Sequence, residues 1–546
     1  MIVSKKLHYA LLSFLILLSV VLRYPTTSHE IIGEDSYYYH MLGNKITSSG
    51  YATWVVSPFS LFGWYPFSTP VGLPYLLSGF SQCTGVGMEY AILIFSFILG
   101  VIGVLAVYAL SLRIKKDGFF AFFVTLTFLT APRLLSMSIW SVTSRYLLIV
   151  LSPLLFFLLL KIRMEKSKRW EFFALLFIFL LTATLIHKTF IFLSSILIAY
   201  VCAHFLFSSN SKKILSCIPE RARFLLPFLI YGLVIMASLQ EQYGRGVFEG
   251  MTPMVLLLNA GATLGSGAGI VATFFGFLGL IYLLWKKEKT FTEVFLILSL
   301  LFIIPFLPTR EYIRGFIPVL LCFFAGFGLV LFFDLVKENR KITLTMFIVV
   351  ILVSLGFASA MINHWRATPP FEENPARYLE GYYTTDETYS TAMFMKTHFG
   401  SSSFVCNDKL LARRLQAFSD KPCLPSMGFA QENNVLIYGF IDEEALNTTP
   451  IGLYDLSFQT DYLFTTEQIG IVRNDYITLM SENYESGQSK EILSKYRVRY
   501  AVEDNRIPGK YLYFDELRGS NFYSSLHQNG HKVYDNGRES IWYIPG

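Results

Sequence analysis

Two adjacent carboxylates stand where the first hydrophobic segment of this 546-residue chain ends. Glu34 and Asp35 follow the apolar segment Leu7–Leu22 and open the run Glu34–His40, which continues with three tyrosines. Carboxylates at such a place can exchange protons with a reacting group at the surface of a bilayer. Successive helical residues point about 100° apart, so only one of the two should face a reacting group. The structural alternative is that one of them caps a helix beginning at Ser36.

Paired cationic side chains occur late in the apolar part of the chain. Arg310 and Arg314 are one helical turn apart, which places them on one helix face and suits a two-point grip on an anionic group. Two structural alternatives stay open: the two arginine side chains extend to lipid head groups, or they form ion pairs with Glu311. His187 and Lys188 stand between two apolar runs, where a charge is costly unless it meets water or an anion.

The elements that must position these residues are membrane helices. The chain is 53% hydrophobic and 16% aromatic with only 15% charged residues, which indicates an integral membrane protein. Apolar runs near the length that crosses a hydrocarbon core, roughly 17–25 residues, recur as far as residue 362. The eleven predicted spans are 7–23, 88–112, 118–133, 143–161, 171–187, 189–208, 223–240, 267–285, 291–307, 314–335 and 342–362.

The distribution of charge predicts the orientation of the chain. Basic residues crowd the alternate connections between spans, which are cytoplasmic by the positive-inside rule. We therefore expect a multi-pass cell-membrane protein with a cytoplasmic N-terminus, and the first loop, residues 24–87, on the extracytoplasmic side with the C-terminal domain. Residues 363–546 hold 17 Lys and Arg against 24 Asp and Glu, so the basic excess lies in the membrane part, and nucleic acid is not an expected partner.

The predicted organisation has two domains, a polytopic all-α membrane domain over 1–362 and a water-soluble α/β domain over 363–546. Segments 403–406, 495–503 and 539–544 favour strands, and 408–418 favours a helix. Cys406 and Cys423 would be bridged or would remain two buried thiols. Glycines within 241–266 suggest a lid, with ordinary membrane-helix glycine as the alternative.

The first loop resembles that of the GT-C superfamily of membrane glycosyltransferases, which take sugars from polyprenyl-phosphate or polyprenyl-diphosphate donors. The run Gly33–His40 is similar to the first-loop motif of oligosaccharyltransferase catalytic subunits. The segment Arg310–Arg314, entering a helix that continues through Ala325 and Gly326, is similar to their late arginine-bearing helix. The resemblance covers the membrane part of the chain.

Two features depart from the oligosaccharyltransferase pattern. The second loop, from Ala131 to Arg145, contains no carboxylate where that family has a second acidic metal-ligand motif. Val405–Asp408 stands where the family has its tryptophan-rich acceptor element. We therefore expect no metal cofactor, with a divalent cation as the less favoured possibility. The monosaccharide transferases of the superfamily, similar to the polyprenyl-phosphate mannosyl and aminoarabinose enzymes, fit better.

The resemblance implies an inverting transfer of sugar from a polyprenyl-linked donor to a lipid, glycan or protein acceptor. Asp35 is the expected base for the acceptor hydroxyl, with Glu34 as second choice. Arg310, Arg314, Lys188 and His187 are the expected contacts of the donor phosphate. The alternatives are protein glycosylation of the oligosaccharyltransferase type, a lipid or polysaccharide transporter, and a non-catalytic membrane assembly protein.

Overall fold

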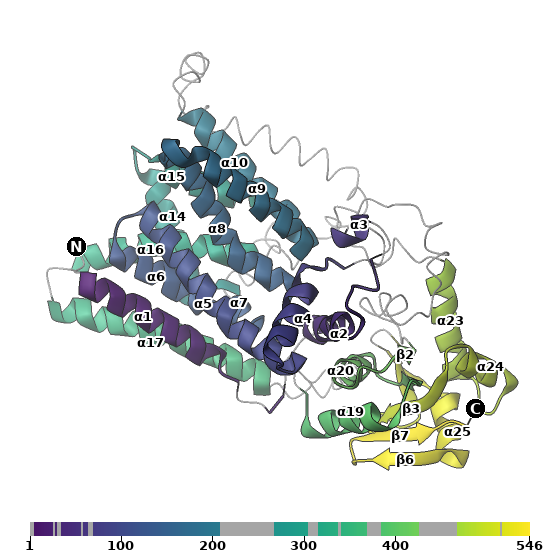
Figure 1. Cartoon of the computed structure of the whole chain (residues 1–546). Helices are drawn as coiled ribbons and strands as arrows, with labels where there is room; N and C mark the ends of the chain where they lie inside the picture. The colour runs from purple at the N-terminus through teal and green to yellow at the C-terminus, as the bar shows by residue number, and fades with distance from the viewer. Residues whose placement is uncertain are drawn as a thin grey trace, which may run out of the picture. The chain divides into compact units, whose positions relative to one another are not determined.

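The structure of the chain is a computed structural model in which two compact units are assembled from interleaved segments (Figure 1). It describes residues 5–25, 28–29, 34–55, 58–63, 69–207, 267–303, 315–336, 340–367, 384–424, 467–513 and 516–545. The membrane unit comprises residues 1–24, 97–139 and 144–364. The loop-and-sheet unit comprises residues 25–96, 140–143 and 365–546. The first loop and the C-terminal residues that follow the last predicted span therefore belong to one compact unit.

Apolar helices build the membrane unit. Within the described residues, six helical segments are long and apolar enough to cross a membrane, and four shorter apolar helices accompany them. The helices are α1 (Lys5–Arg23), α5 (Met88–Ile114), α6 (Gly118–Leu129), α7 (Pro132–Ser136), α8 (Ser144–Met164), α9 (Arg169–Ile186), α10 (Leu193–Leu206), α14 (Ile270–Trp285), α15 (Phe291–Ile303), α16 (Phe316–Val336) and α17 (Arg340–Ala367).

Ten of the eleven predicted spans correspond to these helices, and the mostly helical membrane fold is confirmed. The remaining predicted span, 223–240, and the predicted lid, 241–266, lie outside the described residues. One prediction needs correction. The segment 118–133 is not a single helix, because α6 ends at Leu129 and Pro132 opens the separate short helix α7 after extended backbone at Ala131.

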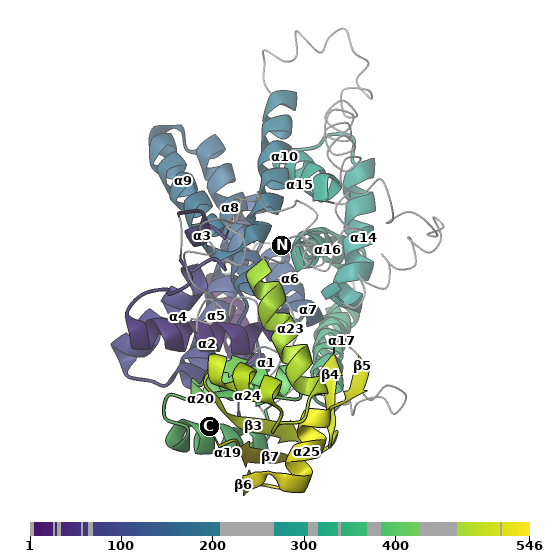
Figure 2. The same ribbon diagram turned by 90° about the vertical axis from the view of Figure 1, so that its right-hand side faces the viewer.

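Close helix packing in the membrane unit depends on small residues. Helices α14 and α16 run side by side (Figure 2). A β-carbon on Gly279 of α14 would lie 1.9 Å from the carbonyl oxygen of Phe324, and one on Gly328 of α16 would lie 2.2 Å from that of Phe275. Both positions therefore require glycine, as in other close membrane-helix crossings.

The first part of the loop-and-sheet unit is the first loop. The first loop folds into α2 (Glu34–Ser49), α3 (Pro58–Leu61) and α4 (Gly72–Thr84), and α4 packs along α2. Within this loop, the Tyr38 hydroxyl lies 2.6 Å from the Thr69 hydroxyl, and the Trp54 indole donates to the Thr69 carbonyl over 3.1 Å. The loop is therefore an ordered helical structure over its described residues.

The C-terminal residues form a five-stranded sheet with flanking helices. Its order is β2-β1-β3-β7-β6, in which β1 pairs parallel with β2 and β3 while β7 pairs antiparallel with β3 and β6. The main elements are α19 (Asp386–His398), β1 (Ser403–Cys406), α20 (Lys409–Ser419), β2 (Cys423–Leu424), α23 (Glu467–Ser481), α24 (Gly487–Lys495), β3 (Val498–Asp504), α25 (Asn521–Asn529), β6 (His531–Asp535) and β7 (Glu539–Tyr543). A separate hairpin joins β4 (Lys510–Tyr513) to β5 (Glu516–Gly519). The predicted α/β architecture is confirmed.

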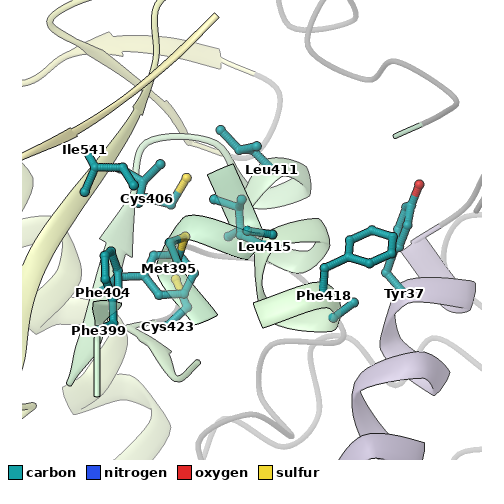
Figure 3. Packing of buried hydrophobic residues seen from close by; sticks show 14 residues of the cluster. Tyr37, Met395, Phe399, Phe404, Cys406, Leu411, Leu415, Phe418, Cys423 and Ile541 are labelled. Atoms are coloured by element: carbon teal, nitrogen blue, oxygen red, sulfur yellow. The ribbon is translucent and has the colours of Figure 1, made fainter. Parts of the chain in front are cut away.

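Cys406 and Cys423 are two free, buried thiols, which decides between the two alternatives. They lie on the neighbouring parallel strands β1 and β2 and belong to one hydrophobic core with Phe404 and Leu415 (Figure 3). Burial raises the pKa of the Cys423 thiol, so it stays protonated at neutral pH. Both cysteines therefore act as small apolar core residues.

Candidate active site

Helix α2 presents Asp35 at its first turn. The helix begins at Glu34, not at Ser36 as the capping alternative assumed, so both carboxylates lie inside the helix rather than before it. The five residues after Asp35 are all buried, whereas Asp35 itself is only half-buried. A helix N-terminus is a favourable place for a negatively charged side chain. The side chain of Glu34 lies outside the described residues.

The second loop contacts the start of α2 through the backbone of Val142, and the two residues before Val142 contact α5. The N–H of Val142 donates to the hydroxyl of Ser36 over 3.1 Å. The carbonyl of Ser141 accepts from Ser96 over 3.0 Å, and the Trp140 indole donates to the Glu89 carbonyl over 3.1 Å. Trp140 has a φ of 43°, a strained conformation for a bulky side chain. The second loop therefore reaches the residue beside Asp35 with main-chain groups.

The C-terminal residues hold the other side of α2. The Tyr37 hydroxyl lies 2.8 Å from the hydroxyl of Thr384, and the Asn44 amide donates to the carbonyl of Ala417 over 2.9 Å. Figure 3 shows the Tyr37 ring beside Phe418 of α20, and Tyr37 belongs to the same core cluster as the sheet residues. The helix that carries Asp35 is thus part of the hydrophobic core of the C-terminal sheet.

His29, six residues before Asp35, connects three segments. One ring nitrogen lies 3.3 Å from the Glu89 carboxylate and the other 3.2 Å from that of Asp386. The ring stacks on Tyr389 with 3.9 Å between centroids. Burial, followed by the Glu89 charge, raises the pKa of the Tyr389 hydroxyl. Sequence reasoning missed His29, because its partners are far apart in the chain and a lone histidine carries no spacing signal.

Of the four predicted phosphate contacts, the structure describes the side chain of His187 alone. Arg310 and Arg314 lie outside the described residues, as does the side chain of Lys188. His187 is buried in the membrane unit, where its Nδ1 accepts from the Thr189 N–H over 3.0 Å and lies 2.8 Å from the Thr189 hydroxyl. The role of these four residues as contacts of a donor phosphate therefore stays a prediction.

The described residues do not fit a metal centre. Over the described ranges, no three His, Cys, Asp or Glu side chains gather closely enough to hold an ion. The two carboxylates nearest His29 contact opposite ring nitrogens and cannot converge on one cation with it. The second loop supplies a serine carbonyl and backbone N–H groups here, and its sequence has no carboxylate.

Comparison with known proteins gives matches at the level of the fold alone. No family model and no curated protein matches the sequence. The oligosaccharyltransferase of Archaeoglobus fulgidus with a tethered acceptor peptide is similar over 100% of this chain and 74% of its own, with 15% identity and a TM-score of 0.58.

Two further solved structures share this architecture. ArnT from Cupriavidus metallidurans is similar over 98% of this chain and 97% of its own, with 12% identity and a TM-score of 0.50. The mycobacterial arabinofuranosyltransferase AftD is similar over 100% of this chain and 42% of its own, with 11% identity and a TM-score of 0.52. Their common architecture is that of GT-C glycosyltransferases, and the GT-C-like fold predicted from the first loop is confirmed.

Proposed function

We propose that this protein is a membrane glycosyltransferase that moves a sugar from a polyprenyl-phosphate or polyprenyl-diphosphate donor to an acceptor hydroxyl. The observation that carries the proposal is the position of Asp35. It is a half-buried carboxylate in the first turn of a helix whose next five residues are buried. The similarity of the fold to an oligosaccharyltransferase and an arabinofuranosyltransferase supports the same class of reaction.

The reaction is a single displacement at the anomeric carbon. The acceptor oxygen forms a bond to that carbon while the bond from carbon to the phosphate oxygen breaks, so the configuration inverts. Asp35 takes the proton from the acceptor hydroxyl, and the polyprenyl phosphate or diphosphate leaves with the bonding electrons. Glu34 is the second choice for the base.

Cationic side chains should hold the departing phosphate. Arg310 and Arg314 are our first candidates because their spacing places both on one helix face, and Lys188 and His187 are the second. The positive charge lowers the free energy of the transition state because the leaving oxygen gains negative charge as the bond breaks.

Two further features belong to the proposal. The basic connections between the spans place the N-terminus in the cytoplasm and Asp35 with the C-terminal domain on the extracytoplasmic face. We also expect the reaction to proceed without a metal ion, because the second loop has no carboxylate.

An acceptor asparagine in a protein is the alternative within the same class. The Archaeoglobus enzyme was solved with a peptide containing an NVT sequon. In this chain Val405–Asp408 forms the end of β1 and the N-cap of α20, and the Asp408 carboxylate accepts hydrogen bonds from two backbone N–H groups of α20. Because Asp408 is used to cap this helix rather than to bind an acceptor peptide, we favour a lipid or glycan hydroxyl as acceptor.

The test is sugar transfer by purified full-length protein. The protein is incubated with a panel of polyprenyl-phosphate monosaccharides radiolabelled in the sugar, and released and transferred label are measured. We expect label to be transferred by the wild type and lost with Asp35→Asn, which keeps size but removes the basic oxygen. A transporter would move donor across vesicles without cleaving it, and an assembly protein would do neither.

A further inference from the structure

We propose that Tyr37 is a positioning residue through which the C-terminal domain sets the orientation of Asp35. This inference rests on the proposed function, because it concerns the efficiency of the proposed base. Three partners of Tyr37 come from one part of the chain, more than 300 residues away. Its hydroxyl lies 2.8 Å from that of Thr384, its ring lies edge-to-face with Phe418 at 6.2 Å, and the Arg414 guanidinium lies 5.7 Å from the ring centre.

The environment of Tyr37 makes this contact specific. Tyr37 is 2% exposed and Thr384 is 3% exposed, so their hydrogen bond is shielded from water. A buried hydroxyl that loses its partner leaves an unsatisfied polar atom, which costs more than the same loss at a surface. Tyr37 is also the only α2 residue in the core cluster built around α20, β1 and β7. The C-terminal domain therefore holds α2 at a single rotation around the helix axis.

That rotation decides where Asp35 points. Tyr37 and Asp35 belong to the same turn of α2, so a rigid helix start transmits any rotation of one to the other. Side-chain atoms lie about 5–6 Å from the axis of a helix, so a rotation of roughly 10° displaces a carboxylate by about 1 Å. A displacement of that size is enough to lower a rate by up to about 100-fold when the reacting group must be aligned.

The chain supplies a matched control on the same helix. The neighbouring Tyr38 makes an equivalent hydroxyl–hydroxyl contact with Thr69 over 2.6 Å, and both residues are buried. Thr69, however, belongs to the first loop itself. Removal of the Tyr38 contact should therefore loosen the loop without disconnecting α2 from the C-terminal domain.

The first experiment compares the two pairs by double-mutant cycles of sugar transfer. We expect Tyr37→Phe and Thr384→Val each to lower kcat about three- to tenfold with donor KM within about twofold, and the double variant to match either single variant. Tyr38→Phe and Thr69→Val should lower the unfolding temperature by a comparable amount while kcat changes less than twofold. Equal effects of the two pairs on kcat, or additive effects of Tyr37→Phe and Thr384→Val, would overturn the proposal.

A second experiment does not depend on catalysis. Asp35→Cys is introduced after the exposed Cys83 is replaced by serine, and its rate of modification by a charged methanethiosulfonate is measured in full-length protein. Tyr37→Phe should change that rate severalfold, and Tyr38→Phe should not. An unchanged rate with Tyr37→Phe contradicts the positioning role. If the wild type transfers no sugar but the rates differ as expected, the proposed function fails and the coupling between Tyr37 and Asp35 stands.

Discussion

The backbone N–H of Val142 donates a hydrogen bond to the side-chain hydroxyl of Ser36 over 3.1 Å. Ser36 is fully buried and directly follows Asp35, so the second loop fixes the start of α2 through a main-chain group. A carboxylate in the second loop beside Asp35 would favour a cation shared by the two loops. The hydrogen bond from Val142 to the neutral Ser36 hydroxyl links the two loops without requiring a cation.

We therefore predict that chelation leaves activity intact. Treatment with EDTA should reduce the rate of sugar release by less than about twofold, because the sequence of the second loop offers no carboxylate to hold a divalent cation together with Asp35. The measurement is the transfer assay before and after chelation, followed by addition of Mg²⁺ or Mn²⁺. Loss of all activity with EDTA and its return with either ion would show that Asp35 is completed as a metal site by carboxylates outside the described residues.

The second prediction separates the base from the phosphate contacts. Asp35→Asn should lower kcat by roughly 10²- to 10⁴-fold with little change in donor affinity, since a general base acts only in the transition state. Arg314→Ala should weaken donor binding as well as turnover, because the phosphate is anionic before and during departure. The control is Glu34→Gln. Full activity of Asp35→Asn combined with an inactive Glu34→Gln would transfer the role of base to Glu34.

Much of the membrane fold was predictable because its signal is local. Apolar runs such as Met88–Ile114 and Phe316–Val336 can be recognised as membrane helices by their length and composition. Strand β1 and helix α20 were predicted from short sequence patterns, and the structure confirms both. The position of Asp35 near the first span follows from the same local signal. These features depend on neighbours in sequence, which a single chain displays directly.

The surroundings of Asp35 were not predictable, because they depend on pairs of residues far apart in the chain. Nothing in the sequence links Tyr37 to Thr384 or His29 to Asp386, and each is one polar residue among many. Helix α4 was missed although Pro74 stands in its first turn, where proline is tolerated. The packing of α2 into the core of the C-terminal sheet is a tertiary preference that neither segment reveals alone.

The third prediction concerns the orientation of the chain. A membrane-impermeant maleimide applied to intact cells should label the native Cys83 and a cysteine placed at Ser401, because both positions are exposed and belong to the predicted extracytoplasmic side. After Cys83 is replaced by serine, a cysteine at Ser167, which is exposed beside basic residues, should react only after the membrane is permeabilised. The opposite labelling pattern would invert the topology and place Asp35 in the cytoplasm.

The fourth prediction tests the helix crossing of the membrane unit. Gly279→Ala should lower the unfolding temperature by several degrees or prevent folding, because its β-carbon would overlap the Phe324 carbonyl. Gly356→Ala on α17 is the matched control, since a β-carbon there meets no atom within 4 Å. Alanine favours a helix over glycine, so this control should be neutral or stabilising. Equal stability of the two variants in detergent would contradict the close crossing of α14 and α16.

The last prediction uses the buried charge of Asp408. Burial, and then the Asp504 carboxylate, raise the pKa of Asp408 above its usual 3.8, with partial opposition from its hydrogen bonds and Arg414. A carboxyl group whose pKa is raised by folding stabilises the folded state below its unfolded pKa, and this contribution is lost as the pH rises through the folded pKa. The Leu410 and Leu411 N–H groups donate to different oxygens of the Asp408 carboxylate, so Asp408→Asn, with a single acceptor oxygen, keeps one of these two cap hydrogen bonds.

Asp408→Asn should therefore unfold at a higher temperature than the wild type at pH 7, and the difference should shrink toward zero as the pH falls to about 4. Asp535→Asn is the control of opposite sign, because the hydrogen bond from Lys532 lowers the pKa of Asp535. That variant should be less stable at pH 7, and its deficit should fade as the pH falls through the lowered pKa. Thermal unfolding of full-length protein between about pH 2 and 8 measures both. If Asp408→Asn were less stable at pH 7, the second cap hydrogen bond and the attraction to Arg414 together would outweigh the cost of burying the charge.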